Sequence, residues 1–142
     1  MGPLSEILDY FLHGDTVTPC FWQANCADNF ICVDPRGNVS QCDCWVTSYP
    51  EMHFGNLFKT SSQTALLNSS PTRREFLNRP GSLIQSHDCG ECEHLAFCHG
   101  GCPVRAYSSY GTLLEKDPYC ETYKQLFSHL KKAARCIASA RA

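Results

Sequence analysis

The stretch DCGECEHLAFCHGGC, residues 88–102, contains four cysteines within fifteen positions. Two residues separate Cys89 from Cys92, a spacing that lets both sulfurs reach one small inorganic centre. Cys98 can join them through a short loop, and the fourth ligand can come from this stretch or from far away in the chain. We therefore expect residues 88–102 to form mostly loop around a metal centre, with one helical turn in ECEHLAFC.

The composition of the chain favours metal ligands over disulfides. The chain has 142 residues, 11 cysteines and a formal net charge of −2. Its first residues, MGPLSEILDYFLHGD, lack the basic start of a secretory signal. We therefore expect a reducing, cytoplasmic setting, in which dense cysteines more often bind metal than pair. The apolar content without cysteine is low for one domain of this length, so inorganic cross-links would help the chain to fold.

The sequence does not support a nucleic acid or a membrane as a partner. No long basic run is present, so the electrostatic signature of a nucleic-acid-binding protein is missing. The longest apolar runs are only a few residues, which is too short to span a bilayer.

Turn residues and hydrophobic periodicity predict a small α+β domain of irregular outline. FICVDPRGNVSQC, residues 30–42, predicts a β-hairpin, because Pro35 suits the first central turn position and Gly37 can take a positive φ. A long C-terminal helix is expected from Asp117-Pro118 to about residue 138. Its apolar stripe consists of Tyr119, Tyr123, Leu126, Leu130, Ala133, Ala134 and Ile137.

Shorter elements complete the expected fold. Ser70 can cap a helix whose first residue is Pro71, and Pro80-Gly81 is expected to end it. Further elements are an N-terminal helix at 4–12, an extended piece at 54–58 and a short helix within 61–70.

The cysteines outside residues 88–102 have an order of their own. Cys20 and Cys26 flank five residues, and Cys26 leads across ten residues to Gly37 and four more to Cys42. The hairpin turn at Gly37 would bring Cys42 back toward the loop between Cys20 and Cys26. Cys120 lies in the first turn of the predicted last helix, where free backbone N–H groups favour a thiolate.

This pattern, C-x10-G-x4-C followed by C-x2-C-x5-C-x3-C and a last C, resembles the SPASM domain. That domain is the C-terminal, twice-clustered extension of many radical S-adenosylmethionine enzymes, and the match runs from Cys20 to Cys120. The resemblance implies an iron–sulfur-stabilised fold with the SPASM domain at 20–142. It also implies that residues 1–19 are a connecting helix and linker to a radical S-adenosylmethionine barrel, which this chain lacks.

The resemblance further implies which thiols hold each of two [4Fe–4S] clusters. It assigns the first cluster to Cys20, Cys26, Cys42 and Cys102. It assigns the second cluster to Cys89, Cys92, Cys98 and Cys120. The crossing of Cys102 into the first site would tie the two halves of the domain together.

Three cysteines remain outside these two sets. We interpret Cys32, on the first hairpin strand, as a small buried residue. Cys44, two positions after Cys42, would lie on the same strand face if the strand continues. It could be a spare ligand or a packing residue, and we interpret it as a packing residue. Cys136 lies about 24 Å along the last helix from Cys120, at ~1.5 Å per residue, so it cannot share that cluster.

Three histidines lie in or beside the cysteine-rich stretch, where a hydrogen bond to sulfur could tune a cluster. We interpret each of them instead as a polar residue in a surface loop: His87, His94 and His99.

The C-x3-C-x2-C motif that binds the catalytic cluster of radical S-adenosylmethionine enzymes is missing. Arg105 stands where the third thiol would follow Cys98-x3-Cys102. The resemblance therefore implies a non-catalytic portion that acts with a radical S-adenosylmethionine barrel, in cis or in trans, on a precursor peptide or a protein side chain. ICVDPRGNVSQCDCW and CHGGCPVRAYSSYG resemble most the branch that forms crosslinks in ribosomally made peptides.

Asp43 directly follows Cys42 in QCDC. In the anaerobic sulfatase-maturating relatives, an aspartate just after the matching cysteine is thought to take a proton from the substrate. The resemblance implies the same role for Asp43, as a general base. The competing interpretation is a surface aspartate at the edge of the hairpin, and the sequence leaves both open.

The residues alone leave other functions open. The chain can be read as an independent electron-transfer module similar to a ferredoxin, or as an interaction module stabilised by zinc. Zinc ribbons usually present two C-x2-C pairs per site, and this chain has only one such pair. A c-type haem is excluded because Glu93, and not histidine, follows Cys92.

Overall fold

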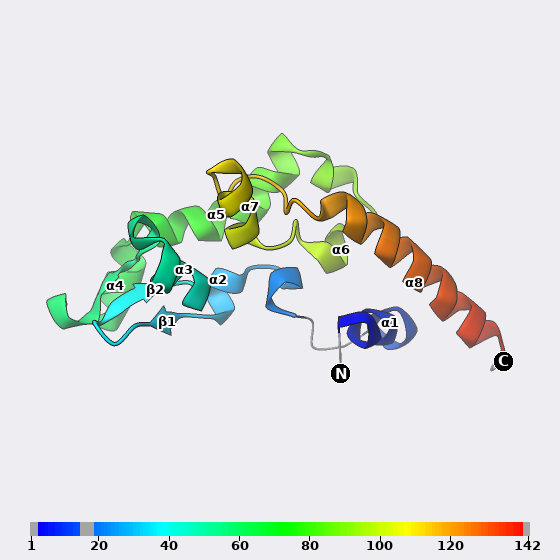
Figure 1. The fold of residues 1–142 in the computed structure, drawn as a ribbon, viewed down its shortest axis with the longest axis horizontal. Coiled ribbons are helices and arrows are strands. Elements are labelled where there is room, and N and C mark those ends of the chain that lie inside the picture. The colour runs from blue at the N-terminus through cyan, green and yellow to red at the C-terminus, as the bar shows by residue number, and fades with distance from the viewer. Residues whose placement is uncertain (1–2, 15–18, 141–142) are drawn as a thin grey trace.

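The computed structural model describes residues 3–14 and 19–140. The sheet lies toward one end of an elongated molecule and the longest helix toward the other (Figure 1). The α-helices are α1 Pro3–His13, α2 Cys26–Asn29, α3 Asp43–Ser48, α4 Gln63–Ser69, α5 Pro71–Ser86, α6 Leu95–Cys98, α7 Pro103–Tyr110 and α8 Cys120–Ala140. The strands are β1 Cys32–Val33, β2 Asn38–Ser40 and β3 Gly55–Asn56, and short 3-10 turns cover Cys20–Trp22, Pro50–Met52, Leu57–Lys59 and Asp88–Glu91.

These elements confirm the predicted fold class, a small α+β domain. The N-terminal helix, the hairpin, the short helices and the long C-terminal helix are all present. Within the described residues, no helix combines the length and the apolar character needed to cross a bilayer.

The predicted hairpin is confirmed and forms two strands of a three-stranded antiparallel sheet in the order β1-β2-β3. Cys32 lies opposite Ser40, and Val39 lies opposite Gly55. At the turn, Gly37 has a φ of 80° and donates its backbone N–H to the Asp34 carbonyl at 2.9 Å. A side chain at Gly37 would be strained, because only glycine adopts this φ readily.

The start of α5 is confirmed, but its predicted end is wrong. The Ser70 hydroxyl accepts the backbone N–H of Arg73, and Pro71 occupies the first turn. The helix then continues past Pro80 to Ser86. Pro80 removes one helical hydrogen bond, but tertiary packing holds the helix on both sides of it. The residues that do so are buried: Phe76, Arg79 and Leu83.

Two helices next to cysteines were not foreseen from the sequence. The chain turns into α3 directly after Cys42, so the strand does not continue to Cys44. Cys44 is exposed, so our interpretation of it as a packing residue is wrong. The chain also turns into α7 directly after Cys102. Pro103 is the first residue of α7. A proline fits there because the backbone N–H that it lacks makes no hydrogen bond at the first position of a helix.

Two hydrophobic clusters form the interior. One cluster lies beside the sheet and centres on Trp45, whose ring contacts Phe76. The other lies between α1, α6 and α8 and centres on Phe97 and Phe127. The predicted stripe of α8 packs into this cluster through Tyr123, Leu126 and Leu130. Phe127, which the predicted stripe omits, is fully buried, and Tyr119, which precedes α8, is 53% exposed.

Candidate metal centres

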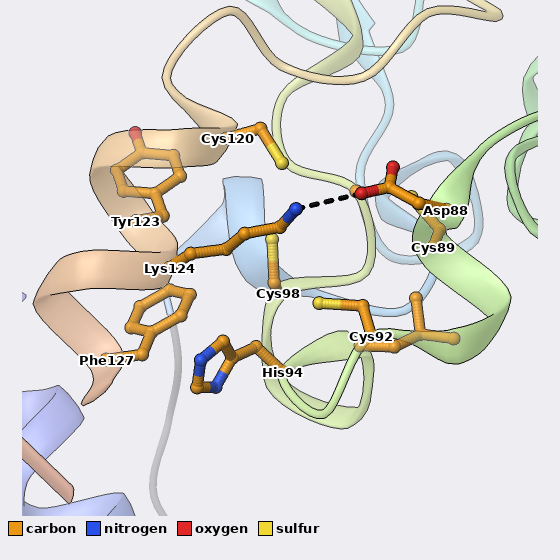
Figure 2. Close-up of a pocket in the computed structure, with 11 residues that line it drawn as sticks. Asp88, Cys89, Cys92, His94, Cys98, Cys120, Tyr123, Lys124 and Phe127 are labelled. Atoms are coloured by element: carbon orange, nitrogen blue, oxygen red, sulfur yellow. Dashed lines mark hydrogen bonds and ion pairs between the residues drawn. The ribbon is translucent and has the colours of Figure 1, made fainter.

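Four of the predicted ligand thiols line one cavity, which we call the closed cage: Cys89, Cys92, Cys98 and Cys120. Cys89 lies in the 3-10 turn Asp88–Glu91, and Cys92 follows that turn. Cys98 ends α6 and Cys120 begins α8. In Figure 2 the sulfurs of Cys92, Cys98 and Cys120 face a common space. Cys89 and Cys98 are buried.

Aromatic side chains cover the closed cage. Tyr123, Phe127 and His94 line the cavity, and the His94 ring centroid lies 5.5 Å from that of Phe127. His94 is 6% exposed and its Nε2 lies 3.3 Å from the Ser128 hydroxyl, so our interpretation of His94 as a surface residue is wrong. Burial lowers the pKa of His94, which favours a neutral ring against the cage.

The other two histidines do not line the closed cage and are only partly exposed. His87 caps the end of α5, and its Nε2 lies 3.5 Å from Glu115. His99 has a φ of 50°, in the left-handed region. Burial lowers the pKa of His99. Both residues are half-buried and lie between helices, so they remain accessible at the surface.

Lysines lie at the rim of the closed cage. Lys124 lines the cavity and donates to Asp88 at 2.9 Å, as the dashed line in Figure 2 shows. Lys116 also donates to Asp88. These two hydrogen bonds lower the pKa of Asp88. Burial raises the pKa of Cys120, while the charges of Lys116 and Lys124 oppose that rise. The lysines at the rim therefore offset part of the effect of burial on the Cys120 thiol.

The other four predicted ligands line a second cavity, which we call the open cage: Cys20, Cys26, Cys42 and Cys102. Cys20 begins a 3-10 turn and Cys26 begins α2, whereas Cys42 and Cys102 immediately precede α3 and α7. Three of these thiols thus lie at the starts of α-helices, where unpaired backbone N–H groups favour a thiolate. Cys20 is exposed.

Cys32 and Asp43 also line the open cage. We interpreted Cys32 as a buried packing residue, but it is only half-buried and borders the cavity. Asp43 opens α3. One of its carboxylate oxygens and the sulfurs of Cys42 and Cys44 all lie within 4.8 Å of one another. The exposed Cys136 lies in α8 and lines neither cage.

Burial disfavours the ionised form of three of the ligand thiols, so a nearby positive charge would help them to ionise. Burial raises the pKa of Cys42 to about 12, although the backbone N–H groups of Trp45 and Cys44 oppose this. Burial also raises the pKa values of Cys26 and Cys98, each to about 11. A bound metal centre supplies that positive charge and deprotonates thiol ligands. Two groups of four such thiols fit the thiolate ligand sets of iron–sulfur clusters.

A sharp turn of the backbone separates the two cages. Cys98 faces the closed cage and Cys102 borders the open one, with Gly100 and Gly101 between them. Gly101 has a φ of 73°, and a Cβ there would lie 2.4 Å from the Cβ of Asp117. Only glycine fits at this position, because both the φ and the close approach exclude a side chain.

Sequence reasoning missed the charged residues between the cages. Asp117 is 2% exposed and accepts the backbone N–H of Cys102 at 2.8 Å and the Arg105 Nε–H at 2.9 Å. Arg79 is 5% exposed. The sequence pattern indicates only that Asp117 starts the last helix and that Arg105 stands where the third cysteine of a C-x3-C-x2-C motif would be. Periodicity carries no signal for such residues, because their burial depends on contacts between distant segments.

Comparisons with known proteins cover most of the chain. A family model described as SPASM, an iron–sulfur cluster-binding domain, matches residues 20–93, which is just over half of the chain. A cysteine-type anaerobic sulfatase-maturating enzyme of Clostridium perfringens is 26% identical over 123 residues, covering 87% of this chain and 31% of that enzyme. An uncharacterized protein of Archaeoglobus fulgidus is 42% identical over 48 residues, covering 34% of this chain and 12% of that protein.

Solved structures show the same fold. Native anSMEcpe with bound AdoMet superposes with a TM-score of 0.66 at 24% identity, covering 96% of this chain and 35% of that chain. Native anSMEcpe with bound AdoMet and Kp18Cys peptide superposes with a TM-score of 0.59 at 22% identity, covering 96% of this chain and 36% of that chain. The chain therefore spans about a third of the length of these relatives.

Proposed function

Because the chain belongs to the SPASM family of iron–sulfur cluster-binding domains, we propose that it holds two auxiliary [4Fe–4S] clusters. Cys20, Cys26, Cys42 and Cys102 would hold one cluster in the open cage. Cys89, Cys92, Cys98 and Cys120 would hold the other in the closed cage. The single observation that supports this most is the grouping of eight thiols, from distant parts of the chain, around two cavities of four.

The proposed role of the domain is electron transfer and substrate docking within an enzyme that modifies peptides or protein side chains. When bound, the clusters supply one-electron chemistry. The chain's own residues hold them, limit their contact with water and set the local charge. In the closed cage the aromatic rings of Tyr123 and Phe127 exclude water, and Lys124 brings positive charge to the rim.

We propose a radical S-adenosylmethionine barrel as the partner, in cis or in trans. The chain corresponds to 31% of the length of the Clostridium enzyme, which leaves room there for such a domain. The binding of AdoMet and a peptide by the structural neighbour supports a peptide substrate, such as a ribosomally made precursor. Residues 1–19 would be the connection, of which 3–13 form α1 against α8, while 15–18 lie outside the described residues. We place the protein in the cytoplasm.

Asp43 is the candidate general base at the open cage. It borders the same cavity as Cys42 and lies at the solvent-exposed start of α3. A carboxylate there can accept a proton from a substrate held against the cage. In the complete enzyme, we expect Asp43→Asn to leave the iron content unchanged and to lower the rate of peptide modification by about 10²-fold or more. Unchanged turnover of the variant would show that Asp43 is a surface residue.

Iron and sulfide analysis of protein purified without oxygen tests the proposed function. We expect about eight irons per chain, at four per cluster, and the broad visible absorption of iron–sulfur charge transfer. Two zinc ions with no visible absorption would instead support the zinc-stabilised interaction module. The ferredoxin-like module would be supported if the protein binds two clusters and transfers electrons without a radical S-adenosylmethionine barrel, and if its reading frame encodes no such barrel.

A further inference from the structure

A buried guanidinium, that of Arg79 in α5, lies between the two cages. Its Nη1 donates to the Gly101 carbonyl at 3.1 Å, next to Cys102 of the open cage. Its Nη2 donates to the carbonyl of Gly100, a residue that lines the closed cage, at 3.2 Å. Arg79 also lines a small cavity together with Cys20 and Cys26. The cation therefore sits at the segment where the chain crosses from one cage to the other.

The hydrogen bonds of Arg79 do not neutralise its charge. Its two other bonds, to the carbonyls of Leu113 and Glu115, also end on neutral backbone oxygens. Across residues 3–14 and 19–140, no carboxylate forms an ion pair with Arg79. A buried charge without a counter-charge is costly, so the surroundings of Arg79 need negative charge from another source.

The nearby carboxylate is already paired. Asp117 forms its ion pair with Arg105, whose guanidinium also lies 4.8 Å from the centroid of the Phe21 ring. Arg79, Arg105 and Asp117 together carry a net positive charge in the region between the cages. Burial lowers the pKa of Arg79, and the charges that oppose this are Cys26 and Cys102 first, then Asp117 and Cys89. The thiols of the cages are therefore the available counter-charges.

We infer that the uncompensated charge of Arg79 raises the reduction potentials of both clusters and couples the two sites electrostatically. This inference rests on the proposed function, because it requires both clusters to be present. Thiolate-bound clusters are net negative and gain a further negative charge on reduction, so a buried cation nearby favours the reduced state. The effect is larger at the open cage, because Arg79 lines a small cavity together with Cys20 and Cys26 and donates to the carbonyl of Gly101, next to Cys102.

The test is a redox titration of the oxygen-free, cluster-loaded protein, monitored by electron paramagnetic resonance. Arg79→Gln removes the cation, and we expect both midpoint potentials to become more negative, with the larger shift at the open cage. Arg79→Lys keeps the charge and should shift them less. Arg74→Gln removes an exposed arginine from the same helix, and we expect no measurable shift because solvent screens that charge. Cys98→Ser and Cys102→Ser backgrounds assign each potential to a cage.

A second substitution, Asp117→Asn, is expected to shift the midpoint potentials of the clusters in the opposite direction. Asp117→Asn keeps the shape and an acceptor oxygen for the Cys102 N–H, but removes the negative charge of the wall. We expect both potentials to become more positive. A role of Arg79 in holding the backbone alone cannot produce shifts of opposite sign at these two positions. If Arg79→Gln fails to retain its clusters, the Asp117→Asn shift decides the question.

The failure of this inference differs from the failure of the proposed function. Wild-type protein without iron and sulfide overturns the proposed function, and this inference with it. Wild-type protein with both clusters, whose midpoint potentials do not change in Arg79→Gln, overturns this inference alone. Equal shifts in Arg79→Gln and Arg79→Lys would also overturn it, because the charge would then not be the cause.

Discussion

The closed cage takes three of its four thiols from ten consecutive residues, whereas the open cage takes its thiols from segments spread between Cys20 and Cys102. The closed cage is covered by Phe127 and Tyr123, and two of its thiols are buried. The open cage has the exposed Cys20 and is bordered by Phe30 and Ile31, which are 42% and 46% exposed. The closed cage is thus enclosed by buried side chains, whereas the open cage is bordered by exposed apolar ones.

The largest effect should come from removing one thiol of each cage. Cys102→Ser should remove the open-cage cluster, and Cys98→Ser the closed-cage cluster, each leaving about four of the eight irons expected for two clusters. Iron and sulfide analysis together with cluster spectra measures this. Cys98→Ser should also lower the thermal unfolding midpoint more, because Cys98 packs in the cluster of Phe97 and Phe127.

A surface cysteine is the control for this pair. Cys136→Ser should keep all the iron, since Cys136 is exposed and lines neither cage. A Cys102→Ser protein that loses only the closed-cage cluster would contradict the crossing of the chain between the sites.

The next effect is on stability at the closed cage. Phe127→Ala should destabilise the protein by about 4 kcal/mol, because a fully buried ring that contacts Trp22 and Phe97 is lost. The same substitution at Phe58, which is 78% exposed, should cost less than about 1 kcal/mol. Urea unfolding without oxygen measures both. A loss below about 1 kcal/mol in Phe127→Ala would show that the ring over the closed cage does not stabilise the protein.

The smallest effect concerns a hydrogen bond on the open-cage side. The Tyr107 hydroxyl, on α7, donates to Glu51 at 3.1 Å, and this bond raises the pKa of Tyr107. A raised pKa in the folded state stabilises the protein below the unfolded value of about 10, and the contribution is lost as the pH rises through the folded value. The difference in unfolding midpoint between wild type and Tyr107→Phe should therefore stay constant below the unfolded value and shrink as the pH rises above about 10. A difference that grows with pH would contradict this sign.

Local patterns predicted much of the fold. The turn at Gly37, the cap at Ser70 and the start of the last helix follow from residues within one or two turns of each other. The same locality explains the errors. The chain continues as helix past Pro80 because Arg79 and Leu83 are held by distant segments, and such contacts have no signal near Pro80 itself.

The sequence alone determined the thiol inventory and its spacing, because C-x2-C pairs and glycine turns are short-range features. It also determined the family, since the spacing persists across the chain. Only the tertiary structure decided that His94 is buried, that Cys32 borders the open cage and that Arg79 lies between the cages. Burial and the pairing of charges depend on which segments meet in space, and those meetings are fixed by packing across many residues rather than by any local pattern.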